Sequence, residues 1–252
     1  LSIEELMSQV STLSLYIRTL YELGKDDELE QLRLRLEAIL GWQSRAELLY
    51  PLALSLLTRN TPQVREAKKL FEIALSQTLE PDLGARNKMG LATCLDILTG
   101  DYHSYEATIR SIDQKKIEPY LCDLVSVWKG KILRDSGRLE EAERFLGSLI
   151  AKVQPCFNWH AYLSAKIILG GVYLRQEKYD RLLSVIKEVR AYCDRYPLRT
   201  IRRQMDHLAD QIKGQEKRPQ LFWKKSGKMK VLRYQDQVLS LSGDQPWQKL
   251  LI

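Results

Sequence analysis

Apolar residues return in a repeated pattern between residues 29 and 189 of the 252-residue chain. Five rounds begin at small or apolar anchor residues, Leu29, Ala67, Tyr105, Ala142 and Leu182. The residue seven places after each anchor is also apolar: Leu36, Ala74, Ile112, Leu149 and Val189. The last four rounds are followed by prolines, Pro81, Pro119, Pro155 and Pro197. Because apolar residues at this spacing share one helix face, every round predicts a helix with one buried side.

The length of the repeat predicts the architecture. Successive anchors are 38, 38, 37 and 40 residues apart, which leaves room for two helices in each round. One helical hairpin cannot bury its own apolar face, so neighbouring hairpins are expected to stack around a continuous core. The sequence therefore predicts a mainly α fold, a right-handed superhelical stack of about five helix-turn-helix repeats in residues 1–214. An unpaired helix is predicted after Pro197, with Gly214 at its end.

The fourth round, GKILRDSGRLEEAERF, carries a more specific pattern. A small residue, a large one, a glycine, a second large residue and an alanine stand at Gly130, Leu133, Gly137, Leu139 and Ala142. This segment resembles the tetratricopeptide repeat (TPR), and the fifth round repeats the pattern with Glu177 at the glycine position. The resemblance implies stacked hairpins that act as a protein-binding module. The period exceeds the family's 34 or so residues, and in this it resembles the superhelical regulatory domains of some bacterial transcription activators.

The resemblance also indicates which residues face the concave side of such a stack. In the family's register, Lys131, Arg134, Arg175 and Asn87 belong to first helices and would line the groove. Basic and amide groups suit an acidic or extended peptide, so these four residues are the candidate peptide-groove site. The alternative is that they belong to ordinary solvated helix faces.

After Gln215 the helical period gives way to two-residue alternation. Residues 221–242 are predicted to form a small antiparallel β-meander, and Asp244 is predicted to cap a new helix. A small sheet followed by a helix resembles the opening of a response-regulator type winged-helix domain, on Val238, Leu239, Leu241, Gly243, Leu250 and Leu251. This implies a second domain, 215–252, formed by a basic linker, the meander and the start of a DNA-binding domain that would continue past Ile252.

Positive charge gathers in the same part of the chain. Residues 213–233 hold eight Lys or Arg residues against Glu216, a balance of +7 that equals the net charge of the whole chain. Direct binding of nucleic acid is therefore an alternative to the regulatory protein-binding module. Its candidate residues are Lys224, Lys225, Lys228, Lys230 and Arg233.

No motif for nucleophilic catalysis, metal binding or phosphate binding occurs in the sequence, so neither an enzyme nor a cofactor is predicted. The four cysteines stand alone, which is typical of buried thiols in a reducing cytoplasm. Trp42, Trp128 and Trp159 are predicted to be packing residues. No apolar stretch approaches the roughly 20 residues of a membrane span, and a cytoplasmic location is predicted. Leu1 in place of Met indicates a chain cut from something longer.

Overall fold

The computed structural model describes residues 10–37, 46–58, 62–153, 155–196, 198–216, 224–226, 229–234 and 237–242. Contacts divide the chain into two units, Leu1–Met205 and Asp206–Ile252, so that the division falls inside the last helix. The domain boundary predicted between residues 214 and 215 stays a prediction. The predicted helix at Asp244 and the winged-helix residues from Gly243 onward lie outside the described residues.

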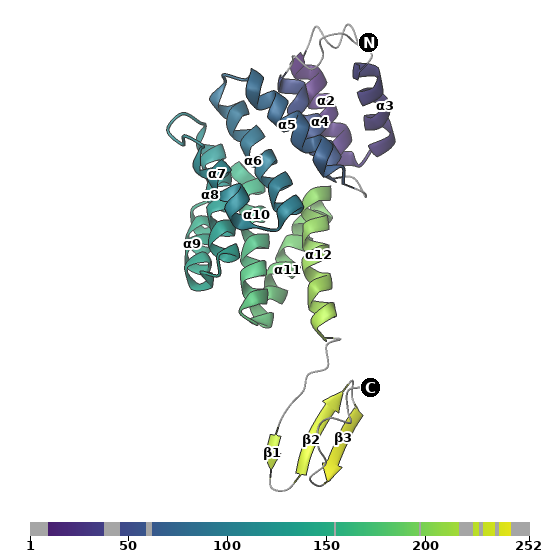
Figure 1. Cartoon of the computed structure of the whole chain (residues 1–252), viewed down its shortest axis with the longest axis vertical. Coiled ribbons are helices and arrows are strands. Elements are labelled where there is room, and N and C mark those ends of the chain that lie inside the picture. Colours follow the sequence, from purple (N-terminus) through teal and green to yellow (C-terminus); the bar gives the residue numbers. More distant parts are fainter. Residues whose placement is uncertain are drawn as a thin grey trace. The chain divides into compact units, whose positions relative to one another are not determined.

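Helices of the first unit pair as successive hairpins (Figure 1). The pairs are α2 (Val10–Leu23) with α3 (Asp26–Glu37), α4 (Ala46–Thr58) with α5 (Val64–Gln77), α6 (Pro81–Thr99) with α7 (Tyr102–Arg110), α8 (Pro119–Asp135) with α9 (Leu139–Lys152), and α10 (Pro155–Arg175) with α11 (Tyr179–Arg195). The helix α12 (Arg199–Glu216) follows them. The described part of the chain thus holds the five predicted hairpins and the predicted unpaired helix. It is a TPR-like stack, in which each first helix contacts the first helix of the next hairpin.

The repeat positions form the interior of the stack. All five anchors are buried, and so are the five residues seven places later. Hydrophobic clusters follow one another along the stack, and single side chains belong to two of them: Leu70 packs on the first two clusters and Leu124 on the last two. The predicted sharing of a core between neighbouring hairpins is therefore confirmed within the first two clusters and within the last two.

The turns inside the hairpins need a left-handed backbone. Gly24, Gly100 and Gly137 have φ values of 73°, 64° and 81°, which glycine adopts without steric cost. Glu177 has a φ of 59° at the corresponding place in the fifth hairpin, where a side chain costs about 1 kcal/mol. The turn geometry is kept even where the glycine is missing, and backbone hydrogen bonds from Glu177 to Leu174 and from Lys178 to Tyr173 close this turn.

Two glycines bring neighbouring helices into close contact. A Cβ atom at Gly90 of α6 would lie 2.3 Å from Cζ of Phe71 in α5, a fully buried ring. A Cβ atom at Gly130 of α8 would lie 2.4 Å from Cδ2 of Leu146 in α9. The steric role predicted for Gly130 is confirmed, since its missing side chain makes room for the leucine.

The second unit begins within α12, which continues through Gly214 to Glu216. The prediction that Gly214 ends the helix is wrong, because one glycine costs a helix only about 1 kcal/mol and does not stop it. Three strands follow, β1 (Lys224–Ser226), β2 (Met229–Tyr234) and β3 (Gln237–Ser242). They pair antiparallel in the order β1-β2-β3.

The predicted fold class needs one correction, because it joined a β-meander to the stack of hairpins. The described residues of the first unit form helices and turns and contain no strand. The short strands pair with one another and belong to the other unit. The fold that defines this protein is therefore the helical stack alone.

Candidate functional site

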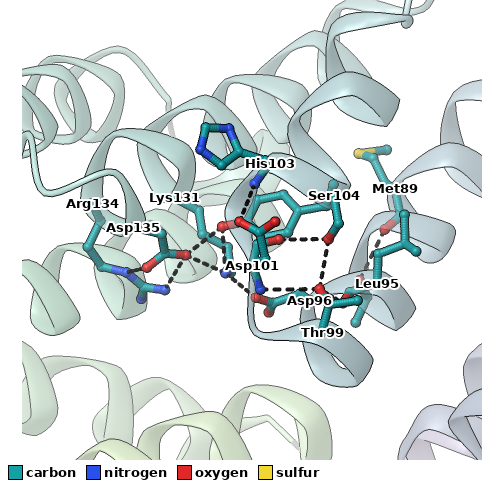
Figure 2. Close-up of polar contacts among 12 residues, drawn as sticks. Met89, Leu95, Asp96, Thr99, Asp101, His103, Ser104, Lys131, Arg134 and Asp135 are labelled. Atoms are coloured by element: carbon teal, nitrogen blue, oxygen red, sulfur yellow. Dashed lines mark hydrogen bonds and ion pairs between the residues drawn. The ribbon is translucent and has the colours of Figure 1, made fainter.

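Three of the four predicted groove residues converge on one carboxylate, Asp135 at the end of α8. Figure 2 shows two of them, Lys131 and Arg134, beside it. Nζ of Lys131 donates to Oδ2 of Asp135 at 2.6 Å and to Oδ1 of Asp96 at 2.8 Å. Nε of Arg134 donates to Oδ1 of Asp135 at 2.8 Å, and Nη2 of Arg175 donates to the same oxygen at 3.1 Å. The hydroxyl of Tyr105 donates to Oδ2 at 2.6 Å. We name these six residues the Asp135 cluster.

Local features of the sequence place these groups. Lys131 and Asp135 stand four residues apart on α8 and so share a helix face. Gly171 leaves space on α10 for Arg134, because a Cβ atom there would lie 2.8 Å from Nη1 of that arginine. Asp101 caps α7 by accepting from the backbone N–H of His103, which sets the start of the helix that carries Tyr105 (Figure 2).

The charges of the cluster are strongly coupled. Burial alone would raise the pKa of Asp135, but hydrogen bonds and charge from Arg134 and Lys131 outweigh it and hold the pKa well below its usual range. Burial, followed by the hydrogen bond to Asp135 and the nearby negative charges, raises the pKa of Tyr105. The carboxylate is therefore ionised and the phenol neutral at neutral pH.

The cluster links three hairpins through their first helices. Asp96 comes from α6, Lys131 and Asp135 from α8, and Arg175 from α10. Three cations face two carboxylates, so most of the predicted positive groove charge is compensated inside the protein. Arg175 keeps 47% of its side chain exposed, whereas Lys131 keeps 14%. Peptide binding by these residues stays a prediction.

The fourth predicted residue, Asn87, lies apart from the cluster and is buried in α6. Its Nδ2 donates to the carbonyl of Leu83 at 2.9 Å. Its Oδ1 is buried without a hydrogen-bond partner among the described residues. Asn87 is thus part of the interior in this conformation and presents no surface to a ligand.

A second group of side chains comes from all five first helices and was not predicted from the sequence. It consists of arginines, aromatic residues and a histidine: Arg18 of α2, Tyr50 of α4, Arg86 of α6, Tyr120 of α8, and Trp159 and His160 of α10. The guanidinium carbon of Arg86 lies 5.3 Å from the centre of the Tyr120 ring. Tyr120 and Trp159 keep 36% and 41% of their surfaces exposed. We name this group the arginine–aromatic face.

Asn158 determines where α10 presents its two aromatic side chains. Its backbone is non-helical, with φ of −141° and ψ of 61°, and its Oδ1 accepts from the N–H of Ala161 at 3.3 Å. Its Nδ2 donates to the carbonyl of Tyr120 at 2.9 Å. A buried asparagine therefore ties the start of α8 to the start of α10.

Electrostatic effects connect the two ends of this face. Burial raises the pKa of Tyr50, while the positive charges of Arg86 and Arg18 lower it. The surrounding protein, and then the charge of Arg18, lower the pKa of His160 to about 4. His160 is nevertheless exposed to solvent. The charge of Arg18 in the first hairpin therefore acts on residues of the second and the fifth hairpins.

The prediction that Trp159 is a packing residue is wrong, because it lies on the exposed side of α10. Trp128 does pack, with its ring 5.5 Å from the ring of Tyr105 in an edge contact. Trp42 lies outside the described residues. Arg18, Arg86 and Tyr120 belong to no sequence motif. Only their positions in the helix register could have indicated that these residues share a face.

The nucleic-acid candidates lie on the strands. Lys224 and Lys225 belong to β1, and Lys230 and Arg233 belong to β2, with Lys225 directly opposite Lys230. Lys228 lies outside the described residues.

Neither a metal site nor a membrane span is found in the part of the chain that the structure describes. No three His, Cys, Asp or Glu side chains there gather as metal ligands would. None of the helices there combines the length and the hydrophobicity that a bilayer crossing demands.

The stacked hairpins define a TPR-like helical-repeat protein. No family model and no curated protein matches the chain. A crystal structure described as kinesin light chain nearly identical TPR-like repeats, from Podosopora anserina, is similar at 17% identity and a TM-score of 0.47. The match covers 75% of this chain and 96% of the other. Likeness at that level says nothing of function, and the TPR-like character rests on the hairpins themselves.

Proposed function

We propose that this protein is a non-enzymatic scaffold that binds a protein or peptide on the arginine–aromatic face of its first helices. One observation carries the proposal: Tyr120 and Trp159, two large aromatic side chains on adjacent first helices, stay exposed. Aromatic residues on such surfaces dominate protein recognition, because they bury much area at a small entropic cost.

Substituting these two residues tests the proposal. We expect Tyr120→Ala and Trp159→Ala each to weaken capture of a cellular partner by at least about tenfold, the effect of an interface hot spot. Quantitative pull-down followed by mass spectrometry measures the loss. Leu183→Ala is the control, since Leu183 is 54% exposed on the second helix α11. Equal capture by all three variants would refute the assignment of this face.

The same proposal extends to a role as the sensory part of a transcriptional regulator. Its support is the basic segment 213–233, which follows the hairpins and carries a charge of +7. A partner bound to the first helices would then act on a neighbouring DNA-binding part. The protein can bind a partner on this face without regulating transcription.

Direct binding of nucleic acid is the second candidate function. The observation in its favour is the pairing of Lys225 with Lys230 across β1 and β2. Like charges at directly opposite positions destabilise a strand pair, and a bound phosphate group would relieve that cost.

The salt dependence of DNA binding tests this second function. If the five basic residues from Lys224 to Arg233 contact phosphates, log affinity for duplex DNA should fall with log salt at a slope of about −4.5. Replacing both Lys225 and Lys230 by glutamine should flatten the slope by about 2. Fluorescence anisotropy over a salt series gives both slopes, and a slope near zero in the native chain would reject the idea.

A further inference from the structure

We infer that two copies of this chain associate through the outer side of α2, with the two helices antiparallel and crossing at Thr19. Contact at this end of the stack goes beyond the partner binding proposed above and uses none of the residues of the arginine–aromatic face.

The outer side of α2 is apolar and exposed. Packing on α3 and α4 buries one side of this helix. On the opposite side, Leu15 and Leu23 are 63% and 56% exposed, and Tyr16 is exposed as well. Thr12 and Thr19 complete this side, and we name these five residues the α2 end face. Because 3.6 residues make one turn, the five residues span a sector of about 100° on the helix, and that sector contains no charged residue.

Thr19 adds to the apolar character of the α2 end face. Its hydroxyl donates to the carbonyl of Leu15 at 3.0 Å, inside its own helix. The hydroxyl is therefore satisfied without a second chain, and the methyl group of Thr19 is left for contact. A partner that packs here loses no hydrogen bond of this residue.

The α2 end face departs from what the end of a repeat stack ordinarily has. Terminal hairpins of repeat proteins carry a polar outer side, because no further hairpin covers it. In Figure 1, α2 and α3 stand at one end of the helical stack. An exposed apolar patch on the order of 300 Å², the size that the three large side chains give, is often an interaction site.

The last helix, α12, shows the ordinary polar surface. Wherever the structure describes an exposed side chain on α12, that side chain is polar: Arg202, Gln204, Asp206, His207, Asp210 and Gln211. Head-to-tail contact of copies would set the α2 end face against this polar surface, and burying polar groups without partners is costly. A contact between two identical faces avoids that cost.

The α2 end face is complementary to itself. Leu15 stands four residues before Thr19, and Leu23 stands four residues after it. In an antiparallel pair centred on Thr19, Leu15 of each copy therefore faces Leu23 of the other, and the smaller threonines meet where the helices cross. A twofold axis requires this kind of self-complementary surface.

The size of the face determines the strength of the dimer. Two copies bury on the order of 600 Å² from these side chains, less than the roughly 1,200 Å² of a standard interface. We therefore expect a weak dimer, with a dissociation constant of about 10 µM or higher.

Sedimentation equilibrium of the full chain over about 5–500 µM tests the inference, because a weak dimer forms and dissociates in that range. We expect a monomer–dimer equilibrium. Leu15→Glu should weaken the dimer by at least about tenfold, since it sets a charge against an apolar surface. Leu183→Glu is the control, because Leu183 is 54% exposed on α11, and it should leave the dimer unchanged. A monomer at every concentration, assembly beyond a dimer, or an equal effect of the two variants would overturn the inference.

A pair of opposite charges tests the antiparallel register. When Leu15→Glu and Leu23→Lys are combined in one chain, each glutamate faces a lysine of the other copy. The double variant should therefore dimerise at least about fivefold more tightly than either single variant. In a parallel pair like charges would meet, so a double variant weaker than both single variants would overturn the proposed geometry.

A covalent link tests the crossing point. Thr19→Cys should form a disulfide between copies under mild oxidation, since the two residues meet where the helices cross. Ser148→Cys, on the exposed side of α9, is the control, and the unsubstituted chain gives the background of the native cysteines. Non-reducing gel electrophoresis measures the yield. Linking of Thr19→Cys no faster than that of Ser148→Cys would contradict the crossing at Thr19.

Self-association and partner binding can fail separately. Tyr120→Ala and Trp159→Ala should leave the dimer intact, because neither residue belongs to the α2 end face. Loss of the dimer in either variant would place the contact on the arginine–aromatic face and overturn the inference. Leu15→Glu should in turn leave capture of a cellular partner by the arginine–aromatic face unchanged.

Discussion

Replacing Asp135 by asparagine is expected to lower the free energy of unfolding by about 3 kcal/mol. The side chain of Asp135 is 13% exposed and accepts hydrogen bonds from Lys131, Arg134, Arg175 and Tyr105. Removing one member of a buried ionic group leaves the other charges without compensation, which costs more than the group itself contributed. Urea unfolding followed by circular dichroism measures the change.

The pH dependence of stability identifies the cause. The pKa of Asp135 in the folded state is below that of an unfolded aspartate, whose ordinary value is 3.8. The stabilisation is therefore fully present above about pH 4 and is lost as the pH falls from there toward the folded pKa. Asp135→Asn should consequently flatten the acid side of the stability curve. A variant that loses stability equally at pH 3 and pH 7 would contradict this explanation.

A matched control separates burial from the loss of a charge. Asp113 is 51% exposed and pairs with Lys116 at 3.4 Å, three residues along the chain. Exposed pairs of this kind contribute less than about 1 kcal/mol. Asp113→Asn should therefore leave both the stability and its pH dependence nearly unchanged.

Placing a methyl group at Gly90 is expected to destabilise the stack by about 2 kcal/mol, although alanine favours helices over glycine. The new Cβ would lie 2.3 Å, 2.4 Å and 2.8 Å from three atoms of the Phe71 ring. The ring is fully buried, so α5 and α6 would have to separate. Gly130→Ala should cost less, because the end of the Leu146 side chain can rotate away.

At Gly147, in contrast to Gly90, a substitution by alanine is expected to stabilise the protein. It lies within α9, and a Cβ atom there meets no atom within 4 Å. Gly147→Ala should therefore stabilise the protein by about 0.5–1 kcal/mol through helix propensity and reduced unfolded-state entropy. Thermal unfolding of the Gly90, Gly130 and Gly147 variants side by side checks the order. If Gly90→Ala were as stable as Gly147→Ala, the close packing of α5 on α6 would be wrong.

Local periodicity was enough to predict the hairpins. Anchors such as Ala67 and Ala142 are buried because helix spacing places them on the inner side, which is a property of the sequence itself. The helix end at Gly214 could not be predicted this way, since a glycine is compatible with both a helix interior and a helix end.

The candidate site was harder to predict, because it depends on contacts between distant residues. Lys131, Arg134 and Arg175 were recognised as first-helix residues, but Asp135 and Asp96 neutralise them across hairpins. Arg18 and His160 interact over a separation that no local pattern encodes. Three-dimensional stacking, and not composition, decides which cations remain available.

The hydrogen bonds that Asp135 accepts have a consequence for how the stack opens. In a repeat protein each hairpin ordinarily contacts only its neighbours, so hairpins can fray one at a time from either end. Asp135 holds groups from the third, fourth and fifth hairpins at one carboxylate. Fraying of the fifth hairpin must therefore break the hydrogen bonds of Arg175 to Asp135 and to the carbonyl of Arg134, which couples its opening to the fourth hairpin.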